Sequence, residues 1–290
     1  ITMLSSIGFH YFETVNQSLQ LQWIEKSKAP KILGWIMAAG SAATLIVYVL
    51  LVLSWKQFNL NFNFVYLISG SFTVLTALFC IVLYPQFQSP TIQNKKIILR
   101  RRYWLYYALQ FMSGARRQIF VVFAGFMMVE RFGFEVHEIT SLFLINLIFN
   151  ILFAPIVGAS ISKYGERRAL LFEYSGLIII FFAYGGIYWF GWGVIIASFL
   201  YILDHIFFAL ALALKTYFQK IANPADIAPT AAVSFTINHI AAVFLPASLG
   251  YLWLVSPSAV FTIASLIALI SFFLALLIPR HPSIGNETIF

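Results

Sequence analysis

Five ionisable side chains of this sequence stand near the middle of long apolar segments, where a charge is costly unless it has a use or a partner. They are Arg116 with Arg117, Asp204 with His205, and Glu13. A guanidinium offers a planar set of donors that fits carboxylate and phosphate groups. Carboxyl and imidazole groups can carry a proton when burial or a partner brings their pKa into range. These five residues are therefore candidates to bind an anionic group and to carry a proton.

A purely structural role is the alternative for each of these groups. An ion pair between one arginine and Asp204 would neutralise two buried charges and order the helices without any ligand. Asn146 and Asn150, one helical turn apart, and the neighbours Asn238 and His239 are further candidates to bind a solute or to bridge helices. We expect bridging for both pairs, because hydrogen bonds between membrane helices are common at about 0.6 kcal/mol each. The charges of the whole set are mixed, so the sequence forces no preference for an anionic solute.

No soluble catalytic motif accompanies these residues. The 5 His are spread over separate segments, so no metal centre is predicted, and the Phe-rich stripes indicate packing surface and no cofactor. We therefore expect a protein that is not an enzyme. An integral-membrane enzyme acting on lipid-borne substrates through His205, His239 and Asp204 is an alternative, which requires these groups within hydrogen-bond reach of one another.

The composition places these side chains in a membrane protein. Hydrophobic residues make up 61% of the chain and charged residues 10%, whereas about a quarter of the residues of soluble domains are charged. About 20 apolar residues in a helix cross a hydrocarbon core of roughly 30 Å. The segments that qualify are 1–22, 32–54, 62–84, 104–130, 138–161, 169–189, 191–218, 229–253 and 257–278. We predict an all-α, polytopic membrane protein with nine transmembrane helices, of which 1–22 is the least apolar.

The basic residues predict the orientation of these helices. If the turn at 162–168 is cytoplasmic and successive spans alternate sides, most of the 18 Lys and Arg fall at or near the inner face. That inner set is Lys26, Lys28, Lys31, Lys95, Lys96, Arg100, Arg101, Arg102, Lys163, Arg167, Arg168, Lys215, Lys220 and Arg280. Only Lys56 and Arg131 fall outside. Basic loops resist translocation, so the C-terminus is predicted to be cytoplasmic, and the +8 net charge needs no nucleic-acid partner.

The turn between two consecutive spans carries a recognisable motif. The segment Gly158-Ala-Ser-Ile-Ser-Lys-Tyr-Gly-Glu-Arg-Arg168 lies there. It resembles the Gly-x-x-x-Asp-Arg-x-Gly-Arg-Arg loop of the major facilitator superfamily of transporters. Gly158, Lys163, Gly165 and Arg167 match that pattern. Gly158 would let two helices approach closely, and Gly165 would permit a tight turn.

The same loop departs from the family pattern at two positions. Ser162 stands where the family has Asp, and Glu166 where a basic residue is usual. In the family, the loop makes charge and helix-end contacts that hold one conformation of the transport cycle. The latch implied by the resemblance comprises Gly158, Ser162, Lys163, Gly165, Arg167 and Arg168. Loss of the Asp puts its acidic part in doubt, and Glu173 is expected to pair with Arg167 or Arg168.

The order of the spans also resembles this family, whose members pair two six-helix halves around a central site. The resemblance implies that 1–84 is the remainder of an N-terminal half with three helices, 85–103 a basic cytoplasmic linker, and 104–290 the C-terminal six-helix half. The chain is then a fragment covering roughly helices four to twelve of an incomplete two-half bundle. In the family, the helices corresponding to those with Glu13, Arg116 and Asp204 flank the central cavity.

The function implied by the resemblance is secondary active transport of a small solute by alternating access, with protons as a candidate coupling ion. A non-transporting sensor or scaffold with the same fold is the alternative, which a sealed, apolar cavity around Arg116 and Asp204 would favour. The expected partners are a small-molecule solute and the lipid bilayer. The expected location is a bacterial inner (plasma) membrane, in which the chain is a multi-pass protein.

Overall fold

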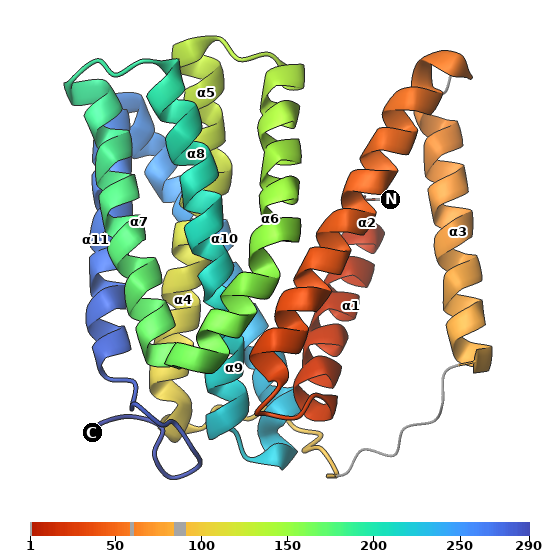
Figure 1. Cartoon of the computed structure of the whole chain (residues 1–290), viewed down its shortest axis with the longest axis vertical. Helices are drawn as coiled ribbons and strands as arrows, with labels where there is room; N and C mark the ends of the chain where they lie inside the picture. The colour runs from red at the N-terminus through yellow and green to blue at the C-terminus, as the bar shows by residue number, and fades with distance from the viewer. Residues whose placement is uncertain (1, 59–60, 84–90) are drawn as a thin grey trace.

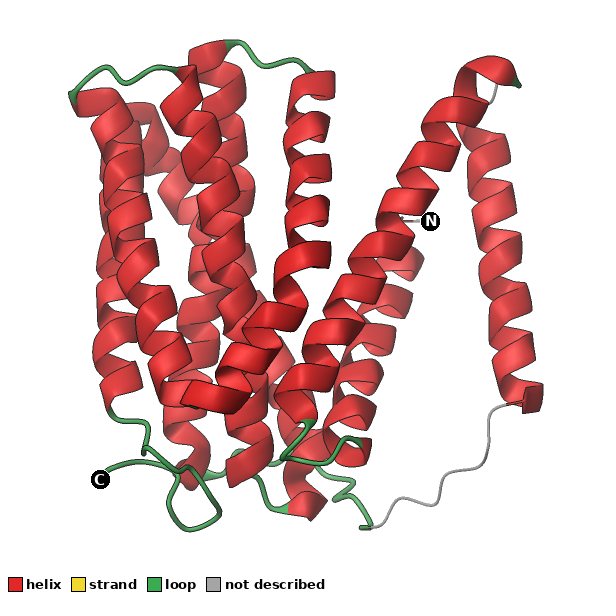
Figure 2. Ribbon diagram, in the orientation of Figure 1, coloured by secondary structure: helices red, strands yellow, loops and turns green. Residues whose placement is uncertain are grey.

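The computed structural model describes residues 2–58, 61–83 and 91–290 (Figure 1). Helices dominate this part of the chain (Figure 2), which confirms the all-α prediction. They are α1 (Thr2–Trp23), α2 (Ala29–Gln57), α3 (Phe62–Leu83), η1 (Arg101–Tyr103), α4 (Trp104–Gln118), η2 (Ile119–Ala124), α5 (Gly125–Phe132), α6 (Val136–Tyr164), α7 (Glu166–Trp189), α8 (Val194–Phe208), η3 (Ala209–Ala211), α9 (Leu212–Ile221), η4 (Pro224–Asp226), α10 (Ile227–Val255) and α11 (Pro257–Leu276).

Each predicted span corresponds to one continuous helical rod in the described residues. Some of these rods consist of several consecutive helical pieces. The π-helical segment η2 joins α4 to α5, and the 3₁₀ turn η3 joins α8 to α9. By length and composition, 7 helices of the described residues could cross a membrane. The α1 rod and the α4–η2–α5 rod, which are richer in polar side chains, lie outside that set.

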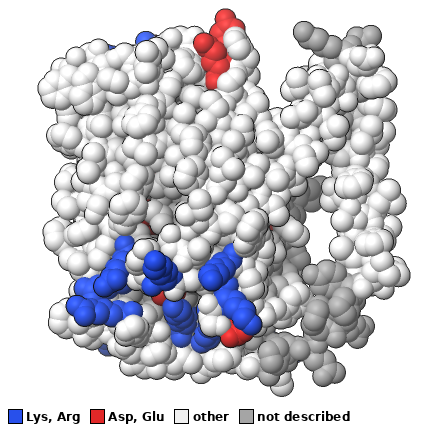
Figure 3. Space-filling model, in the orientation of Figure 1, with Lys and Arg blue, Asp and Glu red and all other residues white. Residues whose placement is uncertain are grey.

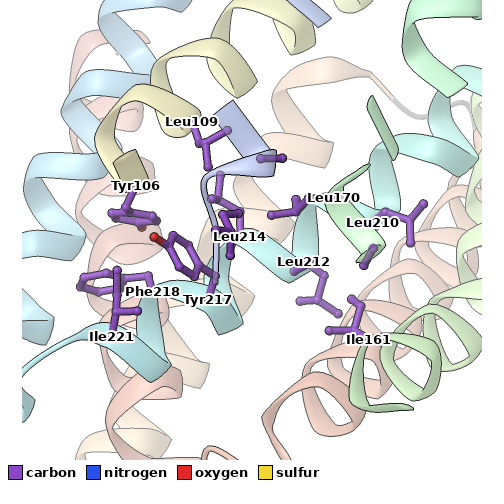
Figure 4. Close-up of a cluster of buried hydrophobic side chains, with 14 of the residues drawn as sticks. Tyr106, Leu109, Ile161, Leu170, Leu210, Leu212, Leu214, Tyr217, Phe218 and Ile221 are labelled. Carbon is purple, nitrogen blue, oxygen red and sulfur yellow. The ribbon is translucent and has the colours of Figure 1, made fainter. Parts of the chain in front are cut away.

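The rods from α4 onwards form one bundle, in which α4 packs against α10 and α7 against α11. Its interior is apolar and aromatic, as the close-up of one core cluster shows (Figure 4). There the rings of Tyr106 and Phe218 stack with their centroids 4.4 Å apart, beside Leu109 and Leu214. By contrast, α3 buries no residue and stands apart from the bundle (Figure 1).

Two glycines bring α2 against α6. A Cβ added to Gly158 would lie 2.3 Å from the carbonyl oxygen of Pro30, and one added to Gly34 would lie 2.5 Å from that of Ala154. Only glycine permits this approach of two backbones, so the contact predicted for Gly158 is confirmed. From this crossing the two helices diverge toward the opposite end of the molecule (Figure 1).

Most Lys and Arg side chains visible on one face gather at the end with the α6–α7 turn (Figure 3). We call the end formed by residues 91–103, 162–168 and 219–226 the basic end. Gly165 alone separates α6 from α7 and has a φ of +84°, which confirms the predicted tight turn. Residues 85–90 of the predicted linker and the side chain of Lys56 lie outside the described residues.

Candidate functional site

A cavity of about 350 Å³ lies among α1, α2, α4, α6, α8, α9 and α10, and we call it the central cavity. Its polar lining comprises Glu13, Gln17, Gln110, Ser113, Arg117, Asn150, His205, Lys215, Ser234, Asn238 and His239. Six of these are among the candidates predicted from sequence. A larger groove of about 860 Å³ between α2 and α3 has a largely apolar lining and offers no comparable set of groups.

Arg116 lies behind the cavity wall in a buried ion pair. Its Nη1 is 3.3 Å from Oε1 of Glu173 on α7, and the two side chains are 1% and 0% exposed. The guanidinium also lies over the ring of Tyr174, 4.4 Å from its centroid. The prediction that Glu173 pairs with Arg167 or Arg168 is therefore wrong. The ion pair that Arg116 forms is also with Glu173 and not with Asp204, the partner considered in the structural alternative. Glu173 lies two turns inside α7, because that helix begins at Glu166.

Asp204 lies in the same buried region as the Arg116–Glu173 pair. Asp204 is 1% exposed and close enough to Arg116 and Glu173 for its charge to act on both. Asn146 is 3% exposed. Among the described residues, Oδ2 of Asp204, Oε2 of Glu173, Nη2 of Arg116 and both side-chain polar atoms of Asn146 have no hydrogen-bond partner. We call Arg116, Glu173 and Asp204 the buried cluster.

Two of the predicted amide side chains bridge helices at the cavity wall. Nδ2 of Asn150 lies 3.0 Å from Nε2 of His205, which joins α6 to α8. Asn238 donates from Nδ2 to the carbonyl oxygen of Gln110 at 3.2 Å, which joins α10 to α4. These contacts match the expected bridging, and both residues also face the cavity. His239 stacks on Phe235 with the ring centroids 4.1 Å apart.

The geometry required for the enzyme alternative is not seen. His205 contacts Asn150, and Nδ1 of His239 lies 2.9 Å from the carbonyl oxygen of Phe235. Asp204 belongs to the buried cluster and does not line the cavity. The described residues also contain no group of three or more His, Cys, Asp or Glu side chains arranged to hold a metal ion.

Lys215 is the main site residue that the sequence reasoning missed. It was expected near the inner face, but it lines the central cavity from α9, within electrostatic range of Glu13 and Arg117. The α8–η3–α9 rod continues to Ile221, beyond the predicted end of the span, so Lys215 lies almost two turns inside the helix. The uncharged Gln17, Gln110, Ser113 and Ser234 gave no sequence signal that separates them from other polar residues.

The basic end joins α1 to the C-terminal bundle through helix-end contacts. Gln219, 1% exposed, donates to the carbonyl oxygens of Leu21 at 2.9 Å and Ile24 at 2.6 Å, which are free at the end of α1. Lys26 donates in return to the carbonyl oxygen of Lys220 at 3.3 Å. Burial lowers the pKa of the Lys26 ammonium.

The α6–α7 loop keeps an acidic group despite the missing Asp. Glu166, 1% exposed, forms an ion pair with Lys220, with 2.7 Å between Oε1 and Nζ. Ser162, Lys163 and Arg168 are exposed, and Arg167 is half-buried. Glu166 thus places a buried acidic group in this loop, at the position where the resemblance implies a basic residue.

Residues 93–103 dock on the loop before α10. Arg100 contacts the carboxylate of Asp226 from Nε at 2.9 Å and from Nη2 at 3.0 Å, and Asn94 donates to it at 2.8 Å. The hydrogen bond and the charge of Asp226 raise the pKa of Arg100. Arg100 and Asn94 therefore hold residues 93–103 against this loop.

Comparison with known proteins indicates the family to which this chain belongs. Residues 1–246 match the family model described as the Major Facilitator Superfamily. No curated protein matches the chain. The family match covers most of the 290 residues, and 7 helices of the described part could span a membrane. The chain is therefore an integral, multi-pass membrane protein that belongs to the Major Facilitator Superfamily of transporters.

Proposed function

We propose that the protein transports a small polar solute with an anionic group, which it binds in the central cavity. The observation that carries this proposal is the charge of the lining. Arg117 and Lys215 supply two cations and Glu13 one carboxylate, so the lining has one excess positive charge when His205 and His239 are neutral. A guanidinium and an ammonium facing a low-dielectric cavity suit a carboxylate or phosphate of the solute.

Alternating access is supported by the contacts at the basic end. Gln219 and Lys26 cap helix ends of the other half through a few hydrogen bonds, which a conformational change can break and remake. Because α2 and α6 approach at this end and diverge from it (Figure 1), this conformation is closed at the basic end. The transport cycle would open these contacts and bring the opposite ends of the halves together.

Proton coupling is supported by the charges of the buried cluster. One guanidinium, that of Arg116, cannot neutralise the carboxylates of both Glu173 and Asp204. The net charge of the cluster is zero when one proton is shared between the carboxyl groups of Glu173 and Asp204. Asp204 adjoins His205, which lines the central cavity, so this proton has a short route to the solute site.

Uptake in proteoliposomes containing the full-length protein tests the proposal, with a panel of anionic, zwitterionic and neutral metabolites. We expect Arg117→Gln and Lys215→Gln to abolish uptake of the anionic solute in folded protein. The matched control Arg280→Gln removes an exposed charge outside the cavity and should leave uptake unchanged. Uptake that persists in both cavity variants would refute this assignment, and uptake indifferent to a pH gradient would refute proton coupling.

A further inference from the structure

A second cavity opens on the lateral surface of the bundle and is separate from the central cavity. This groove of about 410 Å³ lies between α6, α7 and the α8–η3 segment. Apolar side chains such as Phe153, Ile156 and Phe172 dominate its lining, and the last two are 57% and 63% exposed. Tyr164 and Arg168 lie at the basic end of the same groove. The groove is thus apolar along its length and cationic at one end.

The length of the groove matches one leaflet of a bilayer. Phe153 and Tyr164 are eleven positions apart in α6, which corresponds to roughly 16 Å at a rise of about 1.5 Å per residue. One leaflet contributes about half of a hydrocarbon core of roughly 30 Å. An acyl chain lying along α6 therefore places the phosphate of its lipid beside Arg168.

The cations around the headgroup position are available for such a phosphate. Lys163, Arg167 and Arg168 form no ion pair with any acidic side chain of the described residues, and the nearby carboxylate of Glu166 is engaged by Lys220. Lys and Arg gather at this end of the bundle (Figure 3). The predicted orientation makes it cytoplasmic, and each basic residue near an anionic leaflet contributes about 1 kcal/mol of attraction.

One short segment separates this groove from the central cavity. Phe207 and Leu210 face the groove, whereas His205 and Ala209 face the central cavity. Phe207 also packs against the ring of Phe172, with the centroids 5.2 Å apart. The segment contains the 3₁₀ turn η3, where the helical hydrogen-bond pattern changes, and such turns often serve as hinges. A molecule that fills the groove therefore touches the wall of the solute site from behind.

We propose that this groove binds an anionic phospholipid of the cytoplasmic leaflet, with an acyl chain along α6 and the phosphate at Arg168, and that its occupancy regulates transport through the α8–η3 segment. The lipid site stands independently of the solute, whereas its regulatory effect rests on the proposed function.

Native mass spectrometry of the full-length protein tests the lipid site, with phosphatidylglycerol and phosphatidylcholine of identical acyl chains. We expect the wild type to prefer phosphatidylglycerol. Arg168→Gln should weaken phosphatidylglycerol binding by about fivefold, the ratio that corresponds to ~1 kcal/mol. Arg280→Gln, which removes an exposed charge outside the groove lining, should not. Ile156→Trp fills the apolar part and should weaken binding of both lipids.

Several results would overturn the lipid site. Equal binding of the two lipids by the wild type would do so. Equal losses of phosphatidylglycerol binding in Arg168→Gln and Arg280→Gln would also do so, as would unchanged lipid binding in Ile156→Trp. Complete displacement of the lipid by millimolar inorganic phosphate would assign Arg168 to a free anion. Self-association abolished by Ile156→Trp would assign the groove to a second copy of the protein.

Transport in vesicles of either lipid tests the regulatory part. We expect faster uptake in phosphatidylglycerol vesicles than in phosphatidylcholine vesicles, with the difference lost in Arg168→Gln. Uptake that is equal in the two vesicles would overturn regulation. If no solute is taken up in any vesicle but selective lipid binding persists, the proposed function fails while the lipid site is upheld.

Discussion

Replacing Arg116 by methionine tests the energetics of the buried cluster. The side chains of Arg116 and Glu173 are 1% and 0% exposed, so water cannot compensate the charge that loses its partner. Removing one member of a buried ion pair typically costs about 3–5 kcal/mol. Asp204 adds a second carboxylate to the same region, so we expect Arg116→Met to reach the upper part of that range.

The two single variants should differ, because Arg116 has two acidic neighbours. Glu173→Gln leaves the guanidinium beside Asp204, and we expect it to destabilise the protein less than Arg116→Met. The double variant Arg116→Met/Glu173→Gln leaves only Asp204 as an unpaired acid. It should regain at least about 1 kcal/mol relative to the sum of the single losses, within the range measured for contacting residues.

The apparent free energy of unfolding, measured by denaturant titration in detergent micelles, provides the test. Arg117→Gln is the control, because this neighbouring residue is exposed to the cavity and should change stability by no more than about 0.5 kcal/mol. Additive losses in the double variant, or a loss below about 1 kcal/mol in Arg116→Met, would show that the pair contributes little to stability.

Three further substitutions test contacts at the helix crossings and the basic end. Gly158→Ala places a Cβ 2.3 Å from a backbone oxygen and should cost about 1–3 kcal/mol of stability in the same titration, whereas Gly250→Ala, which meets no atom within 4 Å, should cost nothing. Gln219→Leu removes the caps on α1, so distances between spin labels on the basic ends of α1 and α6 should lengthen; unchanged distances would contradict a closing role. Asp226→Asn should release residues 93–103 and speed amide hydrogen exchange at Asn94, whose N–H donates to the carbonyl oxygen of Ala225. Unchanged exchange would show that the Asp226 carboxylate is dispensable for docking.

The sequence was sufficient to place residues along their helices, but it did not identify their neighbours on other helices. The lengths of the apolar segments identified the helical rods. Gly158 was correctly predicted to permit a close contact between two helices. Position along the helices also predicted that Glu13 and His205 lie at a common level, and both line the central cavity. These properties depend on the rise per residue, which is the same in every helix.

The partners of charged groups depend on which helices are adjacent and on how each is rotated. Glu173 contacts Arg116 because of the rotation of α4 and α7 in the bundle, and no spacing within either segment records that rotation. Lys215 was misplaced for a different reason, because a long side chain near the end of an apolar run is normally expected to reach the interface. The 3₁₀ turn η3 and the extension to Ile221 keep it inside the bundle.

Pairs of adjacent ionisable residues mark the wall between the buried cluster and the central cavity. Consecutive residues of a helix point about 100° apart. On α4, Arg116 faces the cluster and Arg117 the cavity; on α8, Asp204 faces the cluster and His205 the cavity. Each helix therefore presents one ionisable group to the proposed proton site and one to the proposed solute site. A rotation of either helix would move both groups together and would thereby link the proposed solute binding to the proposed proton release.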